Sequence, residues 1–471
     1  MESTTGKSGL LLFFLIVLGF SAWVHAQKPT LIITTDIGQD PDDQQSFVRF
    51  LHYANEFNCK GFIANADSNY AHEPPLIRDD ILHDLISKYE LIEDRLRLNA
   101  PGYPSADYLH SLVKPGSNKN GVKIPVETYV GLGHDTEGSD WIIETVQKSK
   151  VPVHISVWGG ACDLAQALWK VRQTFTSAEQ ADFVKKLRVY CIGKQDSSNK
   201  WISNEFPDLW LIQALDPYGN KWASSYRGMF LGGDMSLTSR KWLHTHIIGK
   251  NPLANTYPDK AFTGGKDLNP YGAMKEGDSP SWLYFLPNGL NVPEHPEWGG
   301  WGGRFKQQAP RHFTDTEDRY WDGETGKPEP SNMATVFRWR SDFQNDFAAR
   351  VQWGSREGSK VNHAPIVVLG NAKDTGPVYV KVPAGDTVTL DASSSYDPDG
   401  DALRFHWFVY SEAGNFPTAH DGIIQDVQES KTQVKVPKTA NRKTIHVILR
   451  VTDNGQLPLT AYKRIILEVG P

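Results

Sequence analysis

The sequence predicts an α/β domain with a mostly parallel β-sheet, followed by an all-β sandwich. In the first part, short apolar runs alternate with helix-like segments, and repeated strand-helix units of this kind build a parallel sheet. After residue 362 the pattern changes to short runs of alternating polar and apolar residues, separated by turn residues. The predicted domains are residues 27–355 and 362–471. They are joined by a polar stretch, residues 354–362, across which we expect few contacts.

The first 26 residues predict a secretory signal peptide. Lys7 precedes an apolar run over residues 10–20, and residues 24–26 offer a small-residue cleavage site before Gln27. The run is too short for a membrane span, and no later segment stays apolar for 18 residues. We therefore expect a secreted or periplasmic protein with no membrane partner after cleavage.

Composition narrows the choice of partner. The formal net charge is −6 and there is no basic block, which argues against a nucleic-acid polymer. With 15 Trp and 17 Tyr, the chain has enough aromatic rings to line a sugar-binding cleft, although most of them must fill the core. Cys59, Cys162 and Cys191 lie in apolar stretches, and their odd number does not suit a disulfide framework, so we expect buried free thiols.

The first predicted strand leads into a cluster of acidic residues. Residues 31–35 predict a buried strand, and four carboxylates follow within eight residues: Asp36, Asp40, Asp42 and Asp43. Like charges this close repel, and oxygen-ligated Ca²⁺ or Mg²⁺ is the usual counter-charge in proteins. Asp40 is also the expected cap of a helix that begins with the next residue, so a helix that is merely acidic at its start is the structural alternative.

Further strands and helices follow in alternation. Strands are expected over residues 59–65, 151–158 and 187–192, and helices over residues 74–89, 141–147 and 162–171. Active residues of a parallel sheet gather at the carboxyl ends of its strands. The places to expect a site are therefore the turns that follow these strands.

The acidic strand-turn-helix segment resembles the N-terminal signature of the nucleoside hydrolase superfamily. With Asp-Pro-Asp-Asp-Gln-Gln at residues 40–45 in place of a shorter loop, it is more similar to the nucleoside hydrolase-like domain of secreted proteins labelled cellulose-binding. The resemblance implies a Rossmann-like fold, one Ca²⁺, and hydrolysis of N-glycosyl, ribosyl-type bonds or of O-glycosyl bonds to a furanose. A haloacid dehalogenase-type phosphatase would need an Asp at Thr34 and is excluded.

The resemblance also implies roles for individual residues. Asp36 matches the general base that bridges ion and water. The implied metal ligands are Asp36, Asp42, Asp43, Asp278 and the backbone carbonyl of Trp158, which precedes a Gly-Gly turn. The implied sugar contacts are Asp42, Asn69, Asn199 and Glu205. The expected substrate is a small nucleoside or glycoside, or a polysaccharide.

Two positions depart from the family pattern. Pro207 stands where the family has a further sugar-binding Asn, and Gly277 stands where purine-handling members have a His that protonates the departing base. His295, which is followed by Trp298 and Trp301, is the candidate for a substitute proton donor beside stacking rings; as an alternative, the tryptophans fill the core. The missing acid keeps a second hypothesis open, a carbohydrate-binding protein without catalysis.

The last part of the chain predicts six strands, over residues 378–382, 387–390, 403–409, 432–436, 444–451 and 463–469. The acidic run over residues 397–401, with Trp407 and residues 451–455, resembles a PKD-type immunoglobulin-like module. An EF-hand is excluded because its twelfth position would be Phe408 and no helices flank it, so a tight turn is expected. Such modules space or attach the domains beside them, and we expect no catalytic residues in this one.

Overall fold

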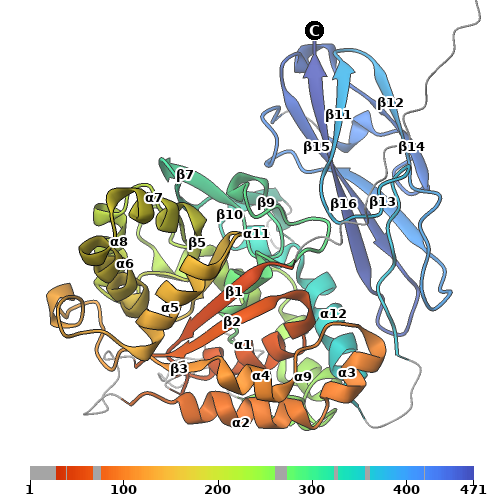
Figure 1. The fold of residues 1–471 in the computed structure, drawn as a ribbon. Helices are drawn as coiled ribbons and strands as arrows, with labels where there is room; N and C mark the ends of the chain where they lie inside the picture. Colours follow the sequence, from red (N-terminus) through yellow and green to blue (C-terminus); the bar gives the residue numbers. More distant parts are fainter. Residues whose placement is uncertain are drawn as a thin grey trace, which may run out of the picture.

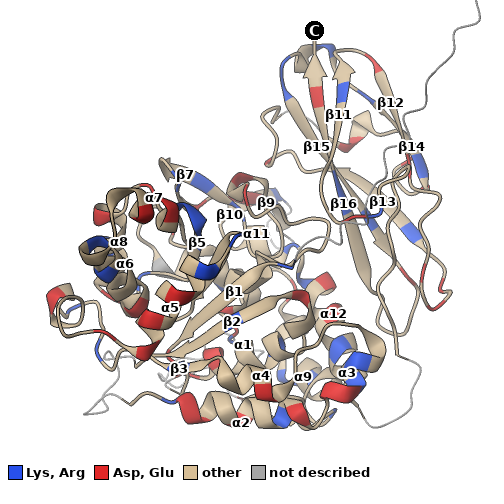
Figure 2. Cartoon of the chain, in the orientation of Figure 1, with Lys and Arg blue, Asp and Glu red and all other residues tan. Residues whose placement is uncertain are grey.

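The computed structural model describes residues 28–38, 40–66, 76–259, 273–322, 327–355, 361–417 and 420–471; the predicted signal peptide and Asn69 lie outside these ranges. The described chain forms a large α/β domain and a smaller β-sandwich (Figure 1). No helix within these ranges is both long and apolar enough to cross a membrane. Figure 2 shows acidic and basic residues interspersed over both domains, as the sequence indicates.

An eight-stranded sheet with the order β3-β2-β1-β4-β5-β6-β8-β7 forms the centre of the α/β domain, and every neighbouring pair is parallel except β7 and β8. The fold class predicted from the repeated strand-helix units is confirmed. The strands are β1 (Thr30–Thr35), β2 (Asn58–Ala64), β3 (Val113–Pro115), β4 (Val153–Val157), β5 (Leu187–Cys191), β6 (Trp210–Gln213), β7 (Phe305–Ala309) and β8 (His312–Asp315).

Helices cover both faces of this sheet (Figure 1). In β1, Leu31 and Ile33 belong to one buried apolar cluster and Ile32 to the other, because successive side chains of a strand point to opposite faces. The longer helices are α1 (Pro41–Leu51), α2 (Asp79–Glu90), α3 (Glu93–Asn99), α5 (Glu137–Lys148), α6 (Cys162–Thr174), α7 (Ser177–Lys186), α8 (Ser198–Glu205), α9 (Arg240–His246) and α12 (Arg340–Trp353). Short helices are α4 (Ala106–Ser111), α10 (Ser279–Leu283) and α11 (Ala334–Phe337).

The strand register brings three turns to one edge of the sheet. Thr34 of β1 lies opposite Val157 of β4, which in turn lies opposite Cys191 of β5. The residues that follow these positions therefore leave the sheet side by side at its carboxyl edge. The three cysteines are buried and free, as predicted.

The sandwich contains a four-stranded sheet, β11-β16-β15-β13, and a two-stranded sheet, β12-β14. Fully buried Trp407 lies in the apolar cluster of this domain. The acidic run is a tight turn, in which Asp397 Oδ1 accepts a 2.8 Å hydrogen bond from the Asp399 backbone N–H. The strands are β11 (Val378–Pro383), β12 (Thr387–Asp391), β13 (Arg404–Val409), β14 (Lys431–Lys435), β15 (Thr444–Thr452) and β16 (Thr460–Gly470).

The sandwich packs closely against the α/β domain, so the expectation of few contacts across the boundary is wrong. Asp342 of α12 is buried and accepts hydrogen bonds from Tyr462 of β16 and Arg450 of β15. Asp318, the first residue of β9 (Asp318–Asp322), accepts a 2.6 Å bond from Tyr410; β9 pairs with β10 (Lys327–Ser331). The linker is polar, but α12 and β9 precede it in sequence and form the interface.

Candidate active site

The acidic turn after β1 enters α1 as the sequence predicts, with one difference at the cap. Asp40 occupies the N-cap position, but its side chain makes no capping hydrogen bond and instead forms an ion pair with Lys275. Asp42 and Asp43 lie in the first turn of α1, where the helix dipole favours negative charge. Asp40, which the sequence predicts only as a helix cap, therefore contacts a loop more than two hundred residues away.

The loop that carries Asp278 is fixed to α1 by buried polar contacts. Gln45 accepts a 2.7 Å hydrogen bond from the Lys275 backbone N–H and donates a 2.8 Å bond to the Ala273 carbonyl. One turn further along α1, fully buried Arg49 pairs with Glu276 at 2.5 Å. These contacts place Asp278 opposite the first turn of α1. The acidic motif at the start of α1 does not reveal the partners of Gln45 and Arg49, because these partners lie in a loop more than two hundred residues away.

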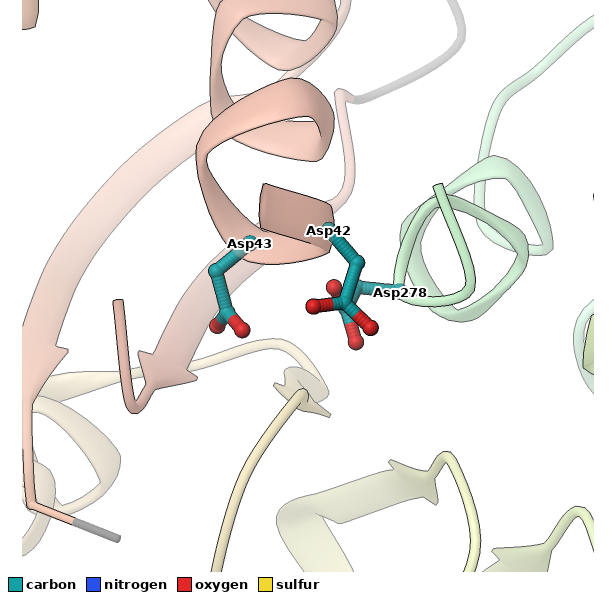
Figure 3. A group of neighbouring side chains, drawn as sticks. All are labelled: Asp42, Asp43 and Asp278. Carbon is teal, nitrogen blue, oxygen red and sulfur yellow. The ribbon is translucent and has the colours of Figure 1, made fainter. Parts of the chain in front are cut away.

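Three carboxylates converge at this point (Figure 3). Asp42 and Asp43 project from α1 toward Asp278, and one carboxylate oxygen from each lies within 4.8 Å of the others. Both oxygens of Asp278 are buried without a hydrogen-bond partner among the described residues. A buried, unpartnered carboxylate is costly, and an oxygen-preferring cation is the group that would satisfy it.

The pKa values of two of these carboxyl groups are raised, as expected for buried carboxylates beside one another. Burial raises the pKa of Asp43 well above its ordinary value, and the charges of Asp278 and Asp42 raise it further. Burial raises the pKa of Asp278 likewise, with additional contributions from Asp42 and Asp36. Both groups therefore favour the protonated form unless a positive charge lies beside them.

Lys275 supplies one positive charge, which the sequence analysis missed. Its ammonium lies 3.2 Å from Asp42 as well as beside Asp40. Burial lowers the pKa of Lys275, but the two carboxylates outweigh this effect, and the net change is upward. Lys275 is therefore charged and pairs with Asp40 and Asp42. Its charge also lowers the pKa of Asp278, and the Thr35 hydroxyl donates a hydrogen bond to Asp43, but burial outweighs both effects.

Asp36 and Trp158 lie at the same edge. Asp36 is buried and packs against Gly159, where an added Cβ would approach the Asp36 carboxyl carbon to 2.5 Å. A side chain at position 159 would therefore displace Asp36. The backbone N–H of Trp158 donates to the Thr34 carbonyl at 2.9 Å, which aligns it with the end of β1. Its carbonyl, the predicted metal ligand, accepts a hydrogen bond from the Gln195 side chain.

Asn199 lies in the first turn of α8, which follows the carboxyl end of β5. Both polar atoms of its buried amide lack a hydrogen-bond partner within the described ranges. Nearby Asp196 also has one unpartnered oxygen, and burial raises its pKa to about 6. These groups give the end of β5 an unsatisfied polar surface, which suits a hydroxyl-bearing ligand.

The structure does not bring Glu205 into this group. It is the last residue of α8, and its carboxylate pairs with Arg172 at 2.6 Å. It shares a surface pocket with Asp208 and Arg311, which precede β6 and β8 and so mark the amino edge of the sheet. Asn199 and Glu205 lie at opposite ends of one regular helix, about 9 Å apart along its axis, which separates the two predicted sugar contacts.

His295 also lies away from the carboxylates. Its ring stacks on Trp298 at 3.8 Å, and Trp298 contacts His446 of the sandwich. The preceding residue, Glu294, pairs at 2.9 Å with Arg188 near the start of β5, again at the amino edge. The predicted proton donor is therefore part of the domain interface. Trp301 is buried there too, in agreement with the core-filling alternative.

Comparisons with known proteins identify the family of this chain. Residues 30–305 match the family model described as "Cellulose-binding Sde182, nucleoside hydrolase-like domain", and residues 387–469 match that of the "Cellulose-binding protein Sde0182, C-terminal domain". A solved structure of a nucleoside hydrolase-related hypothetical protein from Saccharophagus degradans, associated with carbohydrate metabolism, is 31% identical with a TM-score of 0.75. It covers 94% of this chain and 100% of that chain.

Other solved structures are more distant. An inosine-uridine preferring nucleoside hydrolase from Bacillus anthracis is 12% identical, with a TM-score of 0.36, and covers 69% of this chain and 99% of that chain. No curated protein matches the sequence.

Proposed function

Since the chain belongs to the cellulose-binding Sde182 family with a nucleoside hydrolase-like domain, we propose that it is a secreted, calcium-dependent hydrolase of glycosyl bonds, N-glycosyl bonds of ribosyl type included. The observation that carries the proposal is the convergence of Asp42, Asp43 and Asp278 within 4.8 Å. The family label supports a location outside the cell, and residues 1–26 remain the predicted signal peptide.

The donor set fits a hard cation. All the candidate side-chain ligands offer carboxylate oxygen, and two of them carry raised pKa values that a nearby cation would reverse. Asp36, Asp42, Asp43 and Asp278 are the proposed ligands. The Trp158 carbonyl joins them if the Gln195 amide moves away. A bound Ca²⁺ would hold the sugar hydroxyls and lower the pKa of a water beside them.

Three residues of the chain have separate roles in the proposed reaction. Asp36, held against Gly159, accepts the proton of the attacking water as general base. Asn199, with its buried and unpartnered amide, hydrogen-bonds a sugar hydroxyl. Lys275 keeps Asp40 and Asp42 ionised and oriented.

The decisive experiment compares the purified protein with its Asp278→Asn variant. Calcium binding is measured by calorimetry, and sugar release is measured on a panel of nucleosides and furanosides, with and without a chelator. We expect wild-type protein to bind Ca²⁺ and to release sugar only when it is loaded, and the variant to do neither. Asp182→Asn is the matched control, because Asp182 is exposed and pairs with Lys186 on the same helix, α7.

A carbohydrate-binding protein without catalysis is the second candidate, and one observation favours it. Position 277 is glycine, and the alternative proton donor, His295, lies at the domain interface. No candidate acid for the leaving group therefore stands at its expected place. Calcium-dependent sugar binding without sugar release in the same experiment would identify this second function.

A further inference from the structure

The loop over residues 216–227, which follows β6 at the carboxyl edge of the sheet, presents aromatic rings to solvent. Tyr218 is 82% exposed and Trp222 is 44% exposed, whereas Tyr226 is half-buried. Single exposed aromatic side chains are common on protein surfaces, but several on one short segment are typical of a binding surface. Their clustering on one short loop therefore calls for an explanation.

This loop is held rigidly by buried acceptors on both sides. Asp216 accepts backbone hydrogen bonds from Tyr218 at 3.1 Å and from Asn220 at 2.8 Å. Further along, Asp315 at the end of β8 accepts from the Ser225 backbone at 2.8 Å and from its hydroxyl at 2.6 Å. Because the backbone of the loop is fixed in this way, binding carries a lower cost for ordering it.

Its inner end adjoins the carboxylate cluster. A Cβ added at Gly277, the residue before Asp278, would lie 3.2 Å from the Tyr226 ring, so that ring covers the glycine. The charges of Asp42 and Asp278 also reach Tyr226, adding to the effect of burial in raising the pKa of its phenol. Tyr226 is therefore a wall of the same site.

Arg227 connects the inner and outer rings. Its guanidinium lies 4.4 Å from the Trp222 ring centre and 5.1 Å from that of Tyr226. The guanidinium therefore holds the two rings beside one another, and together they form a surface with flat apolar faces. Sugar rings suit such a surface, because their C–H faces pack on aromatic rings.

The exposure of these rings favours an extended sugar chain over a small enclosed ligand such as a nucleobase. Pockets for small ring ligands such as nucleobases enclose about 70 to 90% of the ligand. Tyr218 and Trp222 are too exposed to form such an enclosure, but they suit a chain that continues along the surface. We infer that Tyr226, Trp222 and Tyr218 form a subsite for successive sugar units of an oligosaccharide on the leaving-group side of the carboxylates. This inference rests on the proposed function, because it assumes that the cleaved bond lies at the carboxylate cluster.

The test uses the full calcium-loaded chain and three probes, cellotetraose, arabinotetraose and adenosine, titrated by calorimetry. Wild-type protein is expected to bind at least one tetrasaccharide. Trp222→Ala should weaken that binding about tenfold, and Trp222→Phe should restore most of it. Tyr218→Ala is a second variant, since removal of a side chain that is 82% exposed should not affect folding. Tyr396→Ala, an exposed tyrosine of the sandwich, is the control and should bind as wild type.

Calcium titrations of the same proteins distinguish the two proposals. If wild type binds Ca²⁺ but neither tetrasaccharide, or if Trp222→Ala affects only adenosine, the oligosaccharide subsite is wrong while the proposed function stands. Equal tetrasaccharide affinity in wild type, Trp222→Ala and Tyr218→Ala would also overturn it. If the wild-type protein binds a tetrasaccharide but no Ca²⁺, and Trp222→Ala no longer binds the tetrasaccharide, the subsite stands and the calcium-dependent hydrolase does not.

Discussion

The Arg49 guanidinium lies 2.5 Å from the Glu276 carboxylate, and both side chains are completely buried. Tyr257 and Ser279 also donate hydrogen bonds to Glu276, at 2.6 Å and 2.8 Å. This ion pair joins the helix that carries two of the clustered carboxylates to the loop that carries the third. The geometry of the candidate site therefore depends on a contact between two charged residues that are far apart in sequence.

Loss of this ion pair should destabilise both the fold and the site. Glu276→Gln leaves the Arg49 charge buried without its partner, and we expect a loss of about 3 to 5 kcal/mol in the free energy of unfolding, together with weaker calcium binding. Guanidinium unfolding and calorimetry measure the two effects. Glu205→Gln, which breaks the surface pair with Arg172, is the control and should cost less than about 1 kcal/mol. An equal loss of unfolding free energy in both variants would contradict the conclusion that the buried Arg49–Glu276 pair stabilises the fold more than a surface pair does.

Asp278→Asn should stabilise the protein without metal at neutral pH. Because the pKa of Asp278 is raised from 3.8, the folded state binds more protons than the unfolded state above that pH, so stability falls as pH rises toward the folded pKa. Removal of this group should raise the melting temperature of the chelator-treated protein by about 2 to 4 °C at pH 7.5 and abolish the rise that calcium causes. The control Asp182→Asn should change neither the melting temperature without metal nor the rise that calcium causes. A lower melting temperature for metal-free Asp278→Asn would show that this carboxylate is satisfied without an ion.

Calcium binding should weaken as pH falls. Burial and neighbouring carboxylates raise the pKa values of Asp43 and Asp278, so protons must leave before the cation can bind. We expect a lower affinity at pH 5.5 than at pH 8. Calorimetry in two buffers of different ionisation enthalpy should show proton release at the lower pH. Calcium affinity that does not change across this range would place the ion elsewhere.

Asp36→Asn should separate binding from turnover. If Asp36 is the general base, this variant should keep its fold and much of its sugar affinity while losing about two to four orders of magnitude in kcat. Circular dichroism, sugar titration and released reducing sugar measure the three properties. Asp40→Asn is the comparison, because that carboxylate pairs with Lys275, and its activity should stay within about tenfold of wild type. Full activity of Asp36→Asn would move the base to another carboxylate.

A chain that ends at residue 358 should be unstable, because the sandwich is part of the packed structure. Its removal leaves Asp342 without Arg450 and Tyr462 and exposes the buried ring of Trp301. We expect aggregation, or a melting temperature well below that of the full chain, in light scattering and thermal unfolding. A monomeric truncated protein that melts like the full chain would show that the interface contributes little stability.

The sequence by itself determined the local features. The strand that ends before Asp36, the helix that begins at Pro41 and the carboxylates between them lie within a few residues of one another, so their proximity follows from chain geometry. The six strands of the sandwich were likewise predicted from a period of two. Strands β3, β6 and β7 to β10 were not predicted, because each has at most five residues and so shows too little of a pattern.

Tertiary structure decided which distant residues complete the site. Asp278 was expected there only through a family resemblance, whereas Lys275, Gln45 and the Arg49–Glu276 pair were not expected at all. Conversely, α8 carries Glu205 to the opposite edge of the sheet, and the loop after α10 carries His295 to the sandwich. Local periodicity indicates which face of an element is buried, but it does not state what packs against that face. Contacts between residues two hundred positions apart depend on how whole elements pack, and this is why only the folded chain reveals them.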